Sequence, residues 1–206
     1  VTPETQEYFQ FLTSASGKTV IDTDTYGRCV DIVDKLRNHE CMKIMGMSAN
    51  DNLEHVYNEL QVELDKKFAE FPFGIKGMID NLYIDKASNT IRVNDLKTTS
   101  KTIAEFPETV KFYNYWMQAA VYMRLARSLM HNLKDEYKEY NIVFSFIVID
   151  RYSQIYVFEV SEETMTNWEI DLQEKLNEAK YHYETRDYGL PYKFLKSKNK
   201  VNGIFN

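Results

Sequence analysis

The sequence contains little glycine, proline or cysteine, and each shortage excludes certain kinds of domain organisation or metal site. Among its 206 residues are seven Gly, four Pro and two Cys. The Gly and Pro residues are scattered, with no linker or internal repeat, so we expect a single domain over residues 1–206. Cys29 and Cys41 lie twelve residues apart in one predicted helix and should not pair while that helix is intact. Two thiols also exclude an iron–sulfur cluster held by this chain alone.

Long hydrophobic runs are absent too. No apolar stretch approaches the roughly 18 residues that a transmembrane helix needs, and the polar, acidic segment 1–11 does not resemble a secretory signal. We therefore expect a cytoplasmic protein that does not associate with membranes. The sequence also lacks a glycine-rich phosphate loop and the context of a serine or cysteine nucleophile, so a small-molecule enzyme is the poorer interpretation.

The composition is that of a packed globular chain with an acidic balance. Its hydrophobic share is 44%, its aromatic share 14% and its net charge −6. This net charge does not exclude a nucleic-acid binder, because binding depends on local patches. Near the C-terminus a basic run is typical of a solvated tail, with a phosphate contact as the alternative. Its four cations are Lys193, Lys196, Lys198 and Lys200.

The hydrophobic pattern predicts a helix, three strands, a helix, two strands and a helix. Helices are expected over 25–45, over 108–131 and after the capping residue Ser161. This order predicts a central mixed β-sheet flanked by helices, an α/β or α+β fold. The expected strands are 60–68 and 73–84 as one hairpin, 90–97 after a turn at 85–89, and 142–149 with 154–160 as a second hairpin. The expected core faces are Tyr26, Val30, Val33, Cys41 and Ile44 in the first helix, and Trp168, Leu172, Leu176, Ala179 and Tyr183 in the last.

Two charged residues continue the apolar face of strand 90–97. Side chains alternate between the faces of a strand, so Asp95 and Lys97 share a face with Ile91 and Val93. Burying such charges costs several kcal/mol unless they are paired or bind a ligand. An isolated Asp-x-Lys most often lies at a solvated strand end, where the two charges neutralise each other.

Asp80 makes a catalytic interpretation of Asp95 and Lys97 more specific. It lies fifteen residues before Asp95, and a hairpin through the 85–89 turn brings the two to neighbouring positions at one edge of the sheet. Two close carboxylates repel, and a hard divalent cation such as Mg²⁺ relieves the repulsion while leaving room for water and a phosphate oxygen. Lys97 could then orient or deprotonate the attacking water and stabilise developing negative charge. The set predicts phosphodiester hydrolysis.

A third carboxylate could complete the metal shell. The pattern places Glu59 at the junction before the first hairpin strand, where it could project toward the site. Glu63 lies within that strand and could equally face solvent. We therefore expect Glu59 rather than Glu63 to be the third acid.

The acidic hairpin with Asp80, followed by Asp95-Leu96-Lys97, resembles the PD-(D/E)XK nuclease superfamily, whose fold is a restriction-endonuclease-like core. Gln118 and Tyr122 match the Gln-x-x-x-Tyr signature of its exonuclease branch. That branch includes the RecE-type phage exonucleases, the RecB nuclease domain and lambda exonuclease. The resemblance covers roughly residues 26–124, about half of the chain.

This resemblance implies a role for each matching residue. Asp80, Asp95 and the Leu96 carbonyl would be Mg²⁺ ligands, with Mn²⁺ able to substitute, and Lys97 would be the catalytic lysine. A second pair, Gln118 and Tyr122, lies one helical turn apart on one face and would contact the metal site or the DNA backbone; ordinary core packing is the alternative for these two. The resemblance also implies duplex DNA with ends as the substrate. By analogy with RecE-type enzymes, it implies a homo-oligomer and a single-strand annealing protein as partner.

Two residues depart from the superfamily pattern. Ile79 stands where Pro often precedes the first Asp, and Asn94 stands where an apolar residue is common. Neither position supplies a reacting group, so we expect a difference in geometry rather than in chemistry. After the lysine, a polar run either contacts phosphates or simply begins the next helix. It consists of Thr98, Thr99, Ser100 and Lys101.

We therefore expect a metal-dependent DNA exonuclease of phage or bacterial recombination and repair. A structure-specific or restriction-type endonuclease of the same superfamily is the nearest alternative. A catalytically silent DNA-binding module is a third, which the presence of Asp80, Asp95 and Lys97 opposes, because a decayed site should have lost at least one of them.

Overall fold

The structure is a computed structural model that describes residues 2–48, 55–65, 72, 74–133 and 135–197. Its internal contacts divide the chain into two units, residues 1–39 and 40–206. The expectation of a single domain stays a prediction. None of the helices in the described part of the chain combines the length and apolar character that a bilayer-spanning segment needs.

The first unit consists of two capped helices, α1 (Pro3–Ala15) and α2 (Thr23–Arg37). Pro3 at the start of α1 is compatible with a first helical turn, which needs no donor there. The Asp22 carboxylate caps α2 by accepting the Thr25 N–H at 2.7 Å. The sequence pattern did not predict α1.

The predicted helix over 25–45 is wrong in two respects. It stops at Arg37, where Asn38 donates its side-chain N–H to the Asp34 carbonyl, and a separate short helix, α3 (Cys41–Ile44), follows. No residue of α2 is buried, so the expected core face of this helix is exposed. Tyr26, Val30 and Val33 are 62%, 40% and 42% exposed. Both thiols are free, with Cys29 exposed and Cys41 buried, although they lie in different helices and not in the one intact helix on which the expectation rested.

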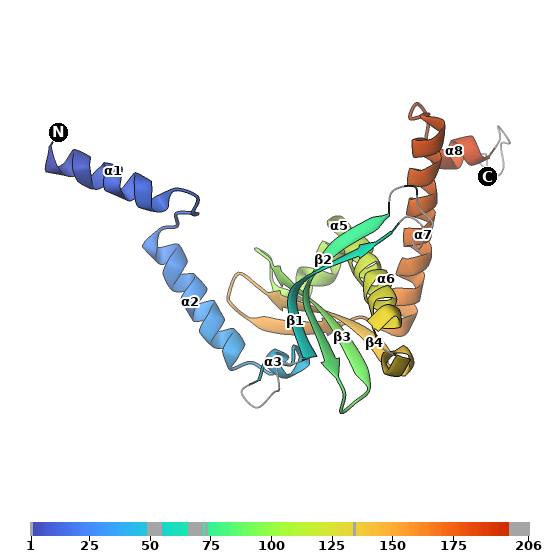
Figure 1. The fold of residues 1–206 in the computed structure, drawn as a ribbon, viewed down its shortest axis with the longest axis horizontal. Coiled ribbons are helices and arrows are strands. Elements are labelled where there is room, and N and C mark those ends of the chain that lie inside the picture. Colours follow the sequence, from blue (N-terminus) through green and yellow to red (C-terminus); the bar gives the residue numbers. More distant parts are fainter. Residues whose placement is uncertain (1, 49–54, 66–71, 73, 134, 198–206) are drawn as a thin grey trace. The chain divides into compact units, whose positions relative to one another are not determined.

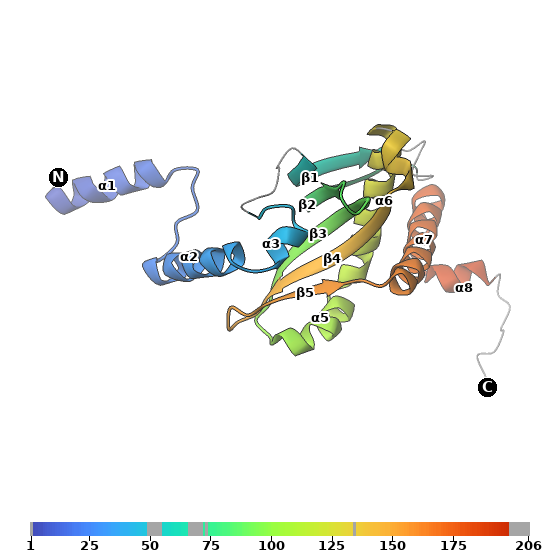
Figure 2. The same cartoon turned by 90° about the horizontal axis from the view of Figure 1, so that it is seen from below.

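The second unit is built on a five-stranded sheet in the order β1-β2-β3-β4-β5, of which Figure 1 labels the first four strands and Figure 2 all five. All neighbouring strands are antiparallel except β3 and β4, which are parallel, so the predicted mixed sheet is confirmed. The parallel pair needs a crossover, and α6 (Tyr115–Leu133) supplies it. The strands are β1 (Val56–Leu64), β2 (Ile75–Asp85), β3 (Thr90–Thr98), β4 (Asn141–Ile149) and β5 (Ile155–Glu159).

Local chemistry explains why the strands turn where they do. The Asp85 carboxylate accepts the N–H groups of Ala87 and Ser88, and Asn89 adopts a left-handed backbone with φ 49°. The predicted turn at 85–89 is therefore confirmed. The β4 run is buried on both faces from Phe144 to Ile149, as its nearly unbroken apolar sequence indicates.

Helices cover the sheet on one face, with α6 against the strands and α7 packed on α6 (Figure 2). The predicted helix over 108–131 is two helices, because Asn114 takes a left-handed backbone with φ 56° between them. On the other face lies α3, whose Ile44 carbonyl accepts from the Asn94 side chain, and directly after it the Met45 carbonyl accepts from Asn81. The helices are α5 (Phe106–Phe112), α6 (Tyr115–Leu133), α7 (Glu162–Thr185) and α8 (Tyr192–Lys196), with 3₁₀ turns at Ile103–Glu105 and Asp135–Glu139.

The predicted core stripe of the long C-terminal helix is confirmed as far as Leu176 only. Ser161 caps α7 as predicted, Leu172 is 2% exposed, and Trp168 and Leu176 pack against the core. Ala179 and Tyr183 are exposed, because α7 extends past the end of α6 and the sheet.

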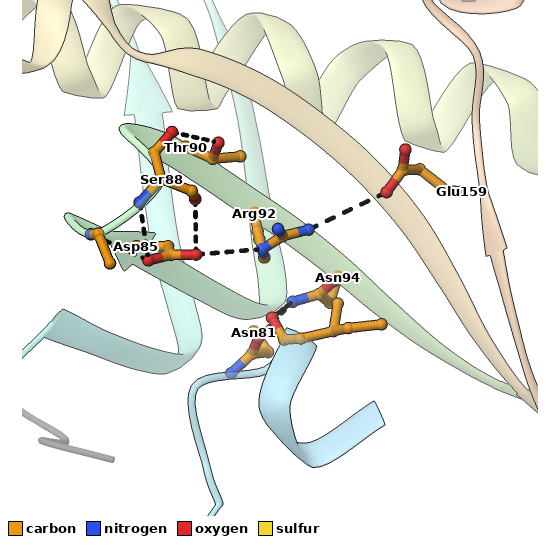
Figure 3. Close-up of polar contacts among 9 residues, drawn as sticks. Asn81, Asp85, Ser88, Thr90, Arg92, Asn94 and Glu159 are labelled. Carbon is orange, nitrogen blue, oxygen red and sulfur yellow. Dashed lines mark hydrogen bonds and ion pairs between the residues drawn. The ribbon is translucent and has the colours of Figure 1, made fainter. Parts of the chain in front are cut away.

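A polar cluster on the α3 face fixes the register of β2 and β3 (Figure 3). Asn94 donates from Nδ2 to Asn81 Oδ1 at 2.8 Å and to the Ile44 carbonyl at 3.2 Å. Nearby, Arg92 lies between the carboxylates of Asp85 and Glu159. Because a slip of one residue would turn every side chain to the wrong face, these contacts hold the register on which the neighbouring acidic residues depend.

Candidate active site

Asp80 lies where β2 departs from β3. The register pairs of these strands run from Asp85↔Thr90 to Asn81↔Asn94, so Asp80 is one step beyond the last pair. There its Oδ2 accepts the Leu96 N–H at 2.9 Å, which is a contact between side chain and backbone instead of a ladder bond. The carboxylate is therefore held against the peptide that follows Asp95.

The regular alternation of β1 and β2 changes at the same point. Ile79 and Leu82 are both fully buried although they are three residues apart, and register pairs are present at Leu60↔Ile79 and Asn58↔Asn81 but not between them. The intervening Glu59 has a left-handed backbone with φ 50°. Left-handed non-glycine residues are strained and gather at functional sites. This distortion lets β2 turn the Asp80 side chain toward β3.

Asp95 is fully buried on the α6 face of β3. Asn94 points to α3, so the alternation of the strand directs Asp95 to the opposite face together with Val93. Burial raises the pKa of Asp95 from 3.8 to about 6; the Lys97 ammonium opposes this effect and the Asp80 charge adds to it. Among the described residues, no group forms a hydrogen bond with Asp95 Oδ1. Both oxygens of this carboxylate are buried, and only Oδ2 has a positive partner, the Lys97 ammonium, so Oδ1 needs a further one.

Lys97 connects Asp95 to two residues of α6. Its Nζ lies 2.6 Å from Asp95 Oδ2 and donates to Gln118 Oε1 at 2.9 Å. Gln118 in turn donates from Nε2 to the Tyr122 hydroxyl at 2.9 Å. Burial raises the pKa of Tyr122, and the charges of Asp95 and Asp80 raise it further. The structure therefore brings all five predicted residues into one neighbourhood.

The chain of hydrogen bonds determines what each group can still do. Gln118 uses both ends of its amide, so its orientation is fixed between Lys97 and Tyr122. Since the Tyr122 oxygen accepts from Gln118, its own proton remains available for an acceptor such as a phosphate oxygen. Lys97 keeps a donor beyond its two partners, because an ammonium group has three.

The polar run after Lys97 leaves the sheet at the same end. Thr98 ends β3, and the Thr99 N–H donates to the Ile149 carbonyl of β4. The Lys101 N–H donates to Thr99 Oγ1, while the side chains of Ser100 and Lys101 are exposed. The run is a turn that leads to the helical segment beginning at Thr102, and its role in phosphate binding stays a prediction.

The predicted position before the first strand is wrong for Glu59, whereas the predicted position within the strand is confirmed for Glu63. Glu59 is inside β1, not at a junction before it, because the strand already begins at Val56. Glu63 is exposed between the buried Val62 and Leu64, so its side chain faces away from the core. In the described part of the chain, no group of three or more His, Cys, Asp or Glu side chains is arranged to hold a metal.

The remaining donors still fit a hard cation. Two carboxylates, one of them with a buried oxygen that lacks a hydrogen bond, are the ligands that Mg²⁺ takes in many phosphate sites, with waters and substrate oxygens completing the shell. Asp80, Asp95 and the Leu96 carbonyl are the groups that could hold it. A third carboxylate is not required by this chemistry.

Two supporting residues escaped sequence reasoning. A Cβ on Gly77 would lie 2.8 Å from Leu125 and 3.1 Å from the Tyr122 ring, so only glycine lets α6 approach β2 this closely. Tyr115 places its ring 4.8 Å from Lys97 Nζ. Nothing in the local pattern marks Gly77, whereas Tyr115, the first residue of α6, could have been predicted from its place three residues before the Gln-x-x-x-Tyr motif.

Comparison with known proteins identifies the family. A model of the PD-(D/E)XK nuclease superfamily matches residues 33–189, which is more than half of the chain. The chain belongs to the PD-(D/E)XK nuclease superfamily. Within this superfamily the site has a recognisable exception: Ile79 replaces the frequent proline and is fully buried, so it packs in the core beside Asp80. The unusual Asn94 is explained by its bonds to Asn81 and α3.

One solved structure supports the fold assignment of this PD-(D/E)XK protein. The crystal structure of a candidate exonuclease from Eubacterium rectale is similar, with a TM-score of 0.55 and 13% identity over 94% of this chain and 68% of that one. At this identity the likeness shows the fold alone. SSO0001 is 16% identical over 58% of this chain and 50% of its own, and its TM-score of 0.33 is too low to support a shared fold. No curated protein matches the chain in sequence.

Proposed function

We propose that this PD-(D/E)XK protein is a metal-dependent DNA exonuclease. One observation carries the proposal: Asp95 is wholly buried with a bare Oδ1, next to Lys97 Nζ and to the peptide that binds Asp80. A core carboxylate whose pKa is raised to about 6 is costly for folding, and such groups gather at functional sites. Asp80, Asp95 and the Leu96 carbonyl bind Mg²⁺ or Mn²⁺.

Each residue has a task in phosphodiester hydrolysis. When bound, the divalent cation polarises the phosphate and lowers the pKa of a water molecule. Lys97 orients the attacking water and stabilises negative charge on the phosphate, from a position that Asp95 and Gln118 hold. Tyr122 donates its free proton to the DNA backbone. The turn from Thr98 to Lys101 contacts neighbouring phosphates.

The Gln118–Tyr122 pair supports an exonuclease over an endonuclease. Both residues match the signature of the exonuclease branch, and they lie in the hydrogen-bond chain of the site, although the buried Tyr122 ring also packs in the core. The fold shared with the Eubacterium rectale candidate exonuclease agrees with this proposal.

Digestion of end-labelled linear duplex and of closed circular duplex tests the proposal. With Mg²⁺, we expect wild type to degrade the linear DNA and leave the circle intact. Lys97→Ala should abolish cleavage and retain binding, because Asp80 and Asp95 remain. The matched control is Lys76→Ala, which removes an exposed lysine of β2 and should cleave like wild type.

Each other outcome has a definite meaning. Cleavage of the closed circle would overturn the exonuclease assignment in favour of an endonuclease. Binding without cleavage under Mg²⁺ and Mn²⁺ would identify a catalytically silent DNA-binding module. Undiminished cleavage by Lys97→Ala would contradict the assigned mechanism.

A further inference from the structure

Three aromatic rings lead from Lys97 to the surface, at the break between α5 and α6. Tyr115 is half-buried and packs near the core rings of Phe106 and Phe146. The next two rings outward, Tyr113 and Phe112, are 59% and 75% exposed. The left-handed backbone of Asn114 produces the break that places them there.

The rings form a continuous series. Lys97 Nζ lies 4.8 Å from the centroid of Tyr115, whose ring is 5.6 Å from that of Tyr113 at an interplanar angle of 24°. Phe112 follows at 4.9 Å from Tyr113, edge to face at 86°. The outer rings are thus connected to the catalytic lysine through direct contacts.

Core formation does not explain the two outer rings. An aromatic side chain gains most from burial, and Phe112 has no polar atom that water could satisfy. Neighbouring exposed aromatics are a feature of binding surfaces. The adjacent Lys111 is also exposed, which gives this surface a cation beside its apolar rings.

We propose that Phe112 and Tyr113 stack against the bases of an unpaired DNA strand whose phosphate backbone passes Lys97. This inference rests on the proposed nuclease function and deepens it. Aromatic rings next to cations are the usual means of holding single strands without sequence preference. Within a duplex, neighbouring base pairs cover the faces of each base, so the platform favours a frayed end or an overhang.

The ring spacing defines how the bases are held. Stacked bases rise about 3.4 Å per step, so a base inserted between two parallel rings needs about 6.8 Å. The 5.6 Å between Tyr113 and Tyr115 leaves no room for one. The bases therefore stack on the outer, solvent-facing surfaces of Tyr113 and Phe112.

A binding cycle with Ca²⁺ in place of Mg²⁺ tests the platform separately from cleavage. Fluorescence anisotropy compares an oligo-dT strand with the same backbone carrying abasic sites, for wild type, Phe112→Leu/Tyr113→Leu and Phe112→Trp/Tyr113→Trp. Both rings are exposed, and the circular dichroism spectrum of each variant verifies folding. A relaxed, covalently closed circular duplex serves as the ligand without free base faces.

We expect loss of the bases to weaken wild-type binding roughly 5- to 150-fold per stacked base. The Leu variant should bind oligo-dT about as weakly as the abasic strand, with its abasic and duplex affinities unchanged, and the Trp variant should behave like wild type. Equal ratios of oligo-dT to abasic affinity in wild type and the Leu variant would overturn the proposal. The two exposed rings would then be a contact surface for a protein partner. Absent cleavage with an intact base effect would instead refute only the nuclease function.

Discussion

Replacing Asp95 with asparagine should reveal what its buried charge costs the metal-free protein. Because burial raises the folded-state pKa of Asp95 from 3.8 to about 6, the folded protein binds this proton more tightly than the unfolded chain does. Its contribution to stability is therefore complete below pH 3.8 and is lost as the pH rises through about 6.

The magnitude follows from the same pKa. A pKa difference of one corresponds to about 1.4 kcal/mol, so the rise at Asp95 corresponds to about 3 kcal/mol, of which about 2 kcal/mol falls between roughly pH 4.5 and 7.5. An asparagine side chain does not titrate, so the difference in unfolding free energy between wild type and Asp95→Asn isolates this term. With rising pH, wild type should lose stability relative to the variant.

Urea unfolding in EDTA measures this difference. Trp116 and Trp168 both pack against the core of the sheet unit, so their fluorescence reports its unfolding. A difference that is independent of pH, or that moves in favour of wild type as the pH rises, would refute the assignment of a desolvated charge at Asp95.

Three further predictions concern the residues that support the site. Gln118→Ala should lower kcat about 100-fold, the scale of a misplaced reacting group, with DNA affinity in Ca²⁺ unchanged; an unaltered kcat would remove Gln118 from the positioning of Lys97. Gly77→Ala should cost about 1–3 kcal/mol in urea unfolding through its clash with Leu125 and Tyr122. Its control Gly27→Ala meets open space in α2 and should cost nothing, so equal effects of the two would contradict the close approach at Gly77. Asn94→Val, which restores the apolar residue common in the superfamily, should destabilise the sheet unit by about 1–3 kcal/mol for each polar group left without its bond, and a stabilised variant would refute the role of the amide cluster.

The strands were predictable because their chemistry is local. Alternation and apolar runs located the two hairpins, and the turn at Asp85 has its own side-chain hydrogen bonds. The pairing of β2 with β3 follows from that short turn, so the neighbourhood of Asp80 and Asp95 could be expected before any coordinates. This expectation required only that β2 and β3 pair in the register that the turn sets.

The breaks in regular structure were not predictable. Glu59 and Asn114 both adopt left-handed backbones, which their residue types do not require and which the surrounding packing imposes. The first breaks the alternation that would otherwise keep Asp80 in the ladder, and the second divides the expected helix over 108–131. Because one continuous helix was predicted, the sequence did not indicate that Phe112 and Tyr113 lie exposed at a break between two helices.

The exposure of helix α2 in the first unit was not predicted, for a different reason. Apolar residues at helical spacing predicted a buried face for α2, yet none of its residues is buried. Periodicity indicates which residues share a face, but not whether the chain supplies a surface to cover that face.

Titration with Mn²⁺, followed by the electron paramagnetic resonance signal of the free ion, tests most directly whether Asp80 and Asp95 bind one divalent cation together. Wild type should show a site that Mg²⁺ displaces, and Asp80→Asn and Asp95→Asn should each lose it. Wild-type affinity for Mn²⁺ in either variant would contradict the shared site and, with it, the hydrolytic role of this PD-(D/E)XK protein.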